Sequence, residues 1–293
     1  MFRKRPWFKW LIISIVLFGV PAAVPGNDQN RTGDFSHVSR VLKREMPYRI
    51  IFPADYERKP EKRYPVIYLI HGLGGNYKNW TDLTKLSENS QNYDFLIAMP
   101  DGGNGWYSDS VTAQDDKYES YLINEFIPLI DKKFRTHGNR ENRVIAGLSM
   151  GGYGAVKFGI KYPDAFKLVG SFSGAFDGPL RLKNSPDARV SINEVFGDDN
   201  DPARMANDIF RLLREKNETE VGKLPFFYID CGTEDRLIKT NRDFLALINE
   251  KKIAHEYREL PGVHNWEFWD SQIEEFLRVA ERKLNRKAKA AAQ

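Results

Sequence analysis

Cysteine is almost absent from this chain. Its 293 residues include a single cysteine, Cys231, so no disulfide can form within the chain and the fold cannot depend on one. Cys231 ends an apolar run that begins at Phe226. This position predicts a buried structural thiol.

An excess of one charge is also missing. The formal net charge of +4 is matched by Arg3, Lys4, Arg5 and Lys9, because no acidic residue precedes Asp28. The remainder is balanced, and its main basic feature is a C-terminal tail, residues 287–293, which is typical of a solvated helix end. The charge pattern therefore indicates no nucleic-acid partner.

Motifs for metals and nucleotides are missing as well. The five histidines are scattered, and the chain contains no H-E-x-x-H and no C-x-x-C. Its glycine-rich segments do not match the phosphate-binding patterns G-x-x-x-x-G-K-[ST] or G-x-G-x-x-G. We predict no metal site and no cofactor.

A long apolar run is the last missing feature. The uncharged stretch over residues 10–25 has 16 residues and two prolines, whereas a membrane-spanning helix needs about 20 apolar residues. A basic start, the apolar residues 11–20 and small residues near Ala22 have the layout of a secretory signal peptide. We predict a signal peptide over residues 1–22, a linker over 23–34 and a secreted or periplasmic protein. The alternative is an uncleaved signal that anchors the chain in a membrane and supplies its one membrane contact.

Apolar residues are plentiful elsewhere, at 41% hydrophobic and 13% aromatic, which supports a sizeable core. Strand patterns alternate with helical ones, and this alternation predicts a parallel sheet with helices on both faces. The first two strands are expected to form an antiparallel hairpin. We predict a single α/β domain over residues 35–286, with strands at 35–42, 46–52, 64–70, 95–99, 143–146, 168–172, 224–231 and 254–260.

Helical spacing is found at residues 118–134, where Pro128 predicts a kink, at 155–162, at 240–252 and at 269–284. Residues 173–207 are polar and rich in glycine, proline and aspartate. A loop of this length is usually functional or holds short helices of its own.

The segment GLSMG, Gly147 to Gly151, lies between a predicted strand and a predicted helix. This context is typical of a nucleophile elbow, in which a sharp turn exposes the serine hydroxyl and glycines relieve the crowding of the backbone. We predict that Ser149 is a nucleophile and that the Met150 N–H faces a developing oxyanion. The alternative is a glycine-rich turn with an incidental serine.

Two further strand ends carry residues that acyl transfer needs. Asp235 follows one strand and His264 follows the last, so the order along the chain is Ser, Asp, His, as in α/β-hydrolases. We predict that His264 is the general base and that Asp235 orients it, with Glu234 as the alternative acid. Asp230 is expected to lie still inside its strand.

The segment HGLGG, His71 to Gly75, follows the central strand and is a candidate second oxyanion element. We assign the second N–H donor to Leu73 and expect His71 to have a structural role. Gly72, Trp106 and Tyr107 are assigned to the substrate pocket, where the two rings would wall the acyl group. The alternative is that both rings pack against the core.

Together these segments resemble the putative esterase family of α/β-hydrolases, which includes esterase D (S-formylglutathione hydrolase), tributyrin-type esterases, feruloyl esterase domains and the antigen 85 mycolyltransferases. The resemblance covers about residues 35–284. It rests on five segments in the family's order: HGLGGNYKNW (71–80), PDGGNGWYSDS (100–110), GLSMGGYGA (147–155), CGTEDRLI (231–238) and PGVHNW (261–266).

The resemblance implies an Ser149–His264–Asp235 triad with Leu73 and Met150 as the oxyanion hole. The segment at Trp106 looks most like the tributyrin and feruloyl esterase branch, while the HGLGG loop departs from the HGLTC of S-formylglutathione hydrolases. We therefore expect a serine carboxylesterase for short-chain or aromatic acyl esters, carbohydrate esters among them. The alternatives are a mycolyltransferase-type acyltransferase, an S-formylglutathione hydrolase-like thioesterase and a non-catalytic binding protein.

Overall fold

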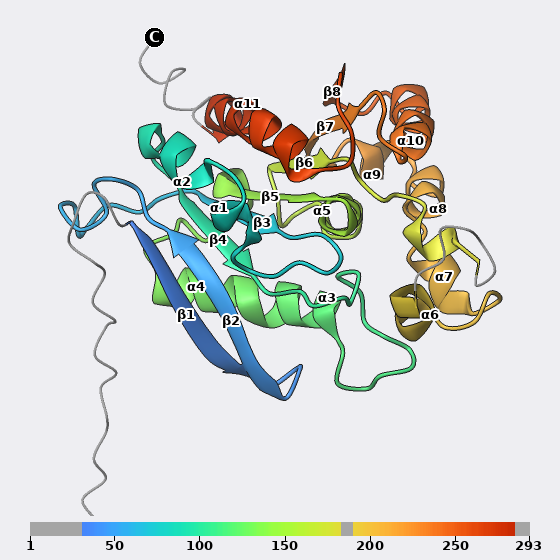
Figure 1. Ribbon diagram of the computed structural model, residues 1–293, viewed down its shortest axis with the longest axis horizontal. Coiled ribbons are helices and arrows are strands. Elements are labelled where there is room, and N and C mark those ends of the chain that lie inside the picture. Colours follow the sequence, from blue (N-terminus) through green and yellow to red (C-terminus); the bar gives the residue numbers. More distant parts are fainter. Residues whose placement is uncertain (1–30, 183–189, 285–293) are drawn as a thin grey trace, which may run out of the picture.

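The computed structural model describes residues 31–182 and 190–284. They form an eight-stranded sheet in the order β1-β2-β4-β3-β5-β6-β7-β8, with helices on both faces (Figure 1). This arrangement confirms the predicted α/β class. The predicted signal peptide and basic tail lie outside the described residues. No helix in the described part of the chain is long and apolar enough to span a membrane.

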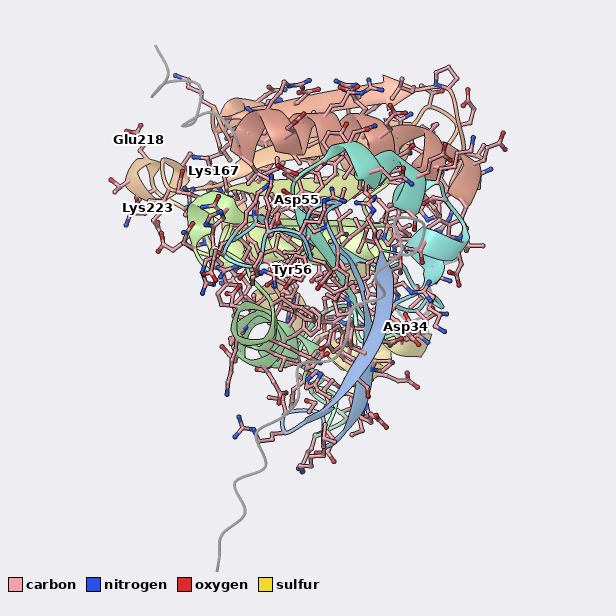
Figure 2. All side chains as sticks on the ribbon, turned by 90° about the vertical axis from the view of Figure 1, so that its left-hand side faces the viewer. Asp34, Asp55, Tyr56, Lys167, Glu218 and Lys223 are labelled. Atoms are coloured by element: carbon pink, nitrogen blue, oxygen red, sulfur yellow. The ribbon has the colours of Figure 1, made fainter. Side chains whose placement is uncertain are left out.

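The first two strands form the predicted antiparallel hairpin, β1 (Thr32–Ser39) with β2 (Arg44–Ile51), and β2 also pairs antiparallel with β4. Thr32 to Asp34 fall within the predicted linker over 23–34, but they belong to β1 because their backbone pairs with Arg49 to Ile51. Asp34, labelled in Figure 2, lies 2.6 Å from the Arg49 guanidinium across the hairpin.

The other six strands run parallel: β3 (Val66–Ile70), β4 (Leu96–Pro100), β5 (Arg143–Leu148), β6 (Leu168–Phe172), β7 (Phe226–Gly232) and β8 (His255–Leu260). Every residue of β3 is buried, as a strand covered on both faces requires. Val66, Tyr68 and Ile70 belong to one core cluster, and Ile67 and Leu69 belong to the other.

One face of the sheet is covered by α1 (Asn79–Asp82), α2 (Leu86–Asn89) and the long C-terminal helix α11 (Trp266–Leu284), seen along the top of Figure 1. The other face is covered by α3 (Tyr118–Tyr121), α4 (Ile127–Lys133), α5 (Met150–Lys161), α8 (Ile209–Arg214) and α10 (Ile238–Glu250). Short 3₁₀ turns lie at Ser90–Asn92 and Arg140–Asn142. The short helix α9 (Glu218–Val221) lies at the rim of the molecule, where Glu218 and Lys223 project in Figure 2.

One detail differs from the sequence-based expectations, and another agrees with them. In place of a simple kink at Pro128, a π-helical segment (Leu122–Phe126) joins α3 to α4, because proline has no N–H to give to the carbonyl four residues earlier. The segment 173–207 does hold short helices, namely a 3₁₀ turn (Gly178–Leu180), α6 (Val190–Phe196) and α7 (Pro202–Ala206).

Candidate active site

A sharp turn between β5 and α5 carries Ser149. Its backbone has φ 54° and ψ −115°, a strained conformation for a residue with a side chain. The flanking glycines allow the close approach: a Cβ on Gly147 would lie 2.7 Å from the Gly151 carbonyl, and one on Gly151 would lie 2.6 Å from the His71 carbonyl oxygen. These contacts give the steric reason for glycine at both positions.

Neighbouring backbone holds this turn in place. The Ser149 N–H donates to the Phe172 carbonyl at 2.9 Å, and the Ser149 carbonyl accepts from the Ala175 N–H at 3.0 Å. Ser149 is therefore fixed to the end of β6 and to the segment after it. Its hydroxyl is free to face the carboxyl ends of the parallel strands, where sites in open α/β sheets lie.

His264 lies in the turn between β8 and α11, and its ring reaches the Ser149 hydroxyl. Nε2 is 3.0 Å from Ser149 Oγ, and Nδ1 is 2.8 Å from Asp235 Oδ2. Asn265 caps α11 by accepting a hydrogen bond from the Phe268 N–H at 3.0 Å, which fixes the turn. The Trp269 ring packs against the imidazole almost at a right angle, with 5.0 Å between the ring centroids.

Asp235 is buried at the start of the turn that leads from β7 to α10, with 2% of its surface exposed. Its other oxygen accepts from the Leu237 N–H at 2.8 Å. Burial opposes ionisation of this carboxyl, but the hydrogen bonds from His264 and Leu237 outweigh it and lower the pKa of Asp235. A carboxylate only accepts, so Nδ1 of His264 carries the proton and Nε2 turns its lone pair to the serine.

The two other acids near this turn lie elsewhere. Glu234 is exposed, and its carboxylate accepts from the Gly262 N–H at 2.8 Å, which ties the β7 turn to the loop that carries His264. Asp230 lies inside β7, as expected, and burial raises its pKa well above the usual range. The structure thus places Asp235, and not the alternative Glu234, against the imidazole.

The loop after β3 approaches Ser149 directly. A Cβ on Gly72 would lie 3.4 Å from Ser149 Cβ and 2.5 Å from Leu148 Cδ1. His71 has the structural role expected of it: its ring lies between the Gly72 carbonyl and the Gly102 N–H, both at 2.8 Å. Burial lowers the pKa of His71. Because Nε2 accepts from the Gly102 N–H, Nδ1 carries the proton and donates to the Gly72 carbonyl. This arrangement holds the HGLGG backbone beside the serine.

A cleft of about 460 Å³ opens over Ser149 and His264. Its lining includes Gly72, which the sequence assigns to the substrate pocket, and Leu73, which it assigns to the oxyanion hole. The lining also includes Leu83, Leu148, Arg236, Trp266 and Trp269. These five residues were not identified from the sequence, although Trp266 and Trp269 lie only two and five residues after His264.

Trp106 and Tyr107 do not line this cleft, so their assignment to the substrate pocket is wrong. Both are buried in the core, at 2% and 1% exposed. Trp106 Nε1 donates to Ser191 Oγ at 3.1 Å, and the Tyr107 hydroxyl donates to the His71 carbonyl at 3.0 Å. Both residues have positive φ, near 50°, which turns the rings inward against α5 and α6. The alternative of core packing is the correct one.

No group of three or more His, Cys, Asp or Glu side chains that could hold a metal ion occurs within residues 31–182 and 190–284. The sequence model of the putative esterase family matches residues 39–279. The chain belongs to the putative esterase family. The resemblance seen in the five sequence segments is thereby confirmed.

Related proteins give the same picture. An acetyl esterase of Caldicellulosiruptor saccharolyticus is 31% identical over 250 residues, which cover 80% of this chain and 92% of that protein. Esterase Rv1288 of Mycobacterium tuberculosis is 30% identical over 73% of this chain and 51% of that protein. A solved ferulic acid esterase superposes with a TM-score of 0.76 at 26% identity, over 86% of this chain and 98% of its own. This esterase has the α/β-hydrolase fold and is a carboxylic ester hydrolase.

Proposed function

We propose that this esterase is a serine carboxylesterase that works through Ser149, His264 and Asp235. The observation that carries the proposal is the unbroken chain from Ser149 Oγ to Nε2 of His264 at 3.0 Å and from Nδ1 to Asp235 at 2.8 Å. A serine hydroxyl becomes a nucleophile when a neighbouring base accepts its proton, and the carboxylate then stabilises the imidazolium. The complete set argues against a non-catalytic binding protein on this fold.

The reaction has two halves. Ser149 Oγ attacks the ester carbonyl carbon while Nε2 of His264 takes the hydroxyl proton. The tetrahedral intermediate then collapses, its bond to the alcohol oxygen breaks, and His264 returns the proton to that oxygen. Water, activated by the same nitrogen, hydrolyses the acyl-enzyme and restores Ser149.

The oxyanion is stabilised by two backbone N–H groups, those of Leu73 and Met150. Met150 begins α5, so its N–H has no acceptor within the helix and lies at the positive end of the helix dipole. No residue that the structure describes accepts a hydrogen bond from the Leu73 N–H. Both donors are therefore available to a negatively charged oxygen next to Ser149.

Short or compact aromatic acyl groups suit the cleft best. Its volume of about 460 Å³ is at the small end for ligand sites, and Trp266, Trp269 and Leu83 provide apolar walls. The names of its relatives, acetyl esterase and ferulic acid esterase, point to the same two kinds of acyl group. We therefore propose acetyl and cinnamoyl-type esters as substrates, with carbohydrates as alcohols.

The test is a comparison of kcat/KM for 4-nitrophenyl esters from acetate to laurate, with methyl ferulate alongside, in the unmodified protein and in Trp266→Ala. We expect the highest value at two to four carbons. Removing the Trp266 ring should move the optimum to longer chains. A highest value at twelve carbons in the unmodified protein would contradict the small cleft, and an unchanged profile in the variant would remove Trp266 from the acyl wall.

We further propose that residues 1–22 act as a signal peptide and that the mature protein is secreted or periplasmic. The support is the basic, apolar and small-residue order of that segment. N-terminal sequencing of the protein purified from outside the cytoplasm should begin close to residue 23. Recovery of the full-length chain from membranes would favour an uncleaved anchor.

A further inference from the structure

A second cavity lies beside the catalytic cleft. Its volume is about 690 Å³, and its lining comes mainly from the turn at Gly178–Leu180, α8 and α10. The helices α8 and α10 are on the right-hand side of Figure 1. Arg236 lines both this cavity and the cleft over Ser149, so the two spaces meet at this side chain. A substrate that is larger than the catalytic cleft can extend past Arg236.

The charged lining of the second cavity is not balanced. Each of its three acids already has a partner: Asp177 lies 2.7 Å from Arg181, and Asp243 lies 2.6 Å from Lys239. The third, Asp208, caps α8 by accepting from the Phe210 N–H at 2.9 Å. All three carboxylates of the lining are therefore already engaged, two in ion pairs and one in a helix cap.

Two arginines of the lining have no such partner among the described residues. Neither Arg214 nor Arg236 has a hydrogen bond or ion pair from its guanidinium to any residue that the structure describes. Arg214 only packs near the Phe210 ring, 5.9 Å from its centroid. Arg181 also lines the cavity, but its guanidinium is already paired with Asp177. The cavity therefore offers N–H donors and positive charge to an anion.

The position of Arg236 determines which half of the ester meets these donors. Asp235, the preceding residue, binds the ring of His264, so Arg236 lies on the histidine side of the cleft. His264 must protonate the departing alcohol oxygen, and the alcohol therefore leaves on this side. The oxyanion donors Leu73 and Met150 belong instead to the loop after β3 and to the start of α5.

We propose that the second cavity binds the alcohol portion of the ester and that Arg236, with Arg214, selects alcohols that carry a carboxylate, such as a uronic acid residue. This inference rests on the proposed function, since it assigns the leaving-group side of that site. Arginine is suited to the task because its planar guanidinium pairs with a carboxylate through two parallel hydrogen bonds. Arg236 is exposed, so the attraction weakens as salt screens it.

The experiment compares two acetyl esters of the same stereochemistry, mono-O-acetylated methyl galacturonoside and mono-O-acetylated methyl galactoside. The readout is the ratio of their kcat/KM values. We expect a ratio of about ten in favour of the acid at low salt, a smaller ratio at 0.5 M NaCl, and a ratio near one in Arg236→Gln, mainly through KM. Arg214→Gln should reduce the ratio in part.

Arg242→Gln is the matched control. It removes the same charge six residues further along, from an arginine that lines neither cavity and is already paired with Glu259 at 2.7 Å. This variant should keep the ratio of the unmodified protein. An equal loss in Arg236→Gln and Arg242→Gln, or a ratio near one in the unmodified protein, would overturn the proposal.

Calorimetric titration with the two free alcohols tests the same selection without turnover. Tighter binding of methyl galacturonoside than of methyl galactoside, lost in Arg236→Gln, supports the proposal even if neither ester is hydrolysed, in which case the proposed function fails alone. Equal binding of the two alcohols in an enzyme that hydrolyses 4-nitrophenyl acetate overturns the alcohol site and leaves the esterase mechanism standing.

Discussion

Replacing Asp235 with asparagine tests how the imidazole is held. The carboxylate accepts two hydrogen bonds, from Nδ1 of His264 and from the Leu237 N–H, both at 2.8 Å. Asparagine has one oxygen for these two donors. If that oxygen faces Leu237, the amide NH₂ faces Nδ1, and the imidazole must carry its proton on Nε2. The nitrogen next to Ser149 then becomes a donor and can no longer accept the hydroxyl proton.

The expected loss is large. In serine proteases an Asp→Asn change that imposes the wrong tautomer lowers kcat by about 10⁴-fold, and that factor corresponds to about 5.4 kcal/mol of transition-state stabilisation. Asp235 is 2% exposed, so water cannot replace the missing acceptor. We therefore expect a loss of about three to four orders of magnitude in kcat for 4-nitrophenyl acetate at pH 7.5, with KM little changed.

Glu234→Gln is the neighbouring control. The Glu234 carboxylate accepts from the Gly262 N–H, and a glutamine keeps an acceptor oxygen in that place. Its kcat should stay within about threefold of the unmodified value by the same assay, with circular dichroism and the melting temperature showing that both variants are folded. A larger loss in Glu234→Gln than in Asp235→Asn would refute the assignment of the acid.

Two further changes test the packing around the site. Burial opposes ionisation of Glu119, but Lys157 and Lys161 outweigh it and lower its pKa to about 2, so its stabilising effect is complete above about pH 4.5 and is lost as pH falls towards 2. Glu119→Gln should therefore lower the free energy of unfolding by about 3–5 kcal/mol at pH 7, because it leaves Lys157 buried and unpaired. The loss should be smaller at pH 3. Equal losses in urea titrations at both pH values would count against the ion pair. Trp106→Ala should cost about 3–5 kcal/mol of stability as a core truncation and leave the dependence of kcat/KM on acyl length unchanged. A shifted length profile at unchanged stability would return Trp106 to the substrate pocket.

Much of the fold could be predicted from local sequence patterns. The buried runs of β3 and β4 are apolar at every position, which identifies strands covered on both faces. Ser149 could be found because a strand, a G-x-S-x-G turn and a helix follow one another directly. Ser149, Asp235 and His264 follow β5, β7 and β8, three of the four consecutive parallel strands β5-β6-β7-β8, so their side chains meet at the carboxyl ends of these strands.

The walls of the cleft could not be found in this way. Trp106 follows the carboxyl end of β4, on the side of the sheet where the site lies, but its positive φ turns the ring into the core. Trp266 starts a helix whose periodicity is dominated by its buried face, and this pattern does not show that the first ring faces the cleft. Backbone conformation decided the case of Trp106, and the place of Trp266 follows from where the start of α11 lies beside the cleft. Hydrophobic periodicity reports neither.

Arg236 illustrates another limit of the sequence. The residues next to it in the sequence identify the loop that carries the catalytic acid. Its guanidinium lacks a carboxylate partner because Asp177 is paired with Arg181 and Asp243 with Lys239. Such pairings depend on how the segment after β6 packs against α10. They become visible only once the fold brings these segments together.

The most direct test of the central claim is the site of acylation. The enzyme is mixed with 4-nitrophenyl acetate, quenched within the first turnover and examined by intact and peptide mass spectrometry, with Ser149→Ala in parallel. We expect one acetyl group per chain, located on the peptide that contains Ser149, and a loss of turnover of about 10⁴-fold or more in the variant. An acetyl group on another residue, or ordinary turnover by a folded Ser149→Ala protein, would contradict the mechanism.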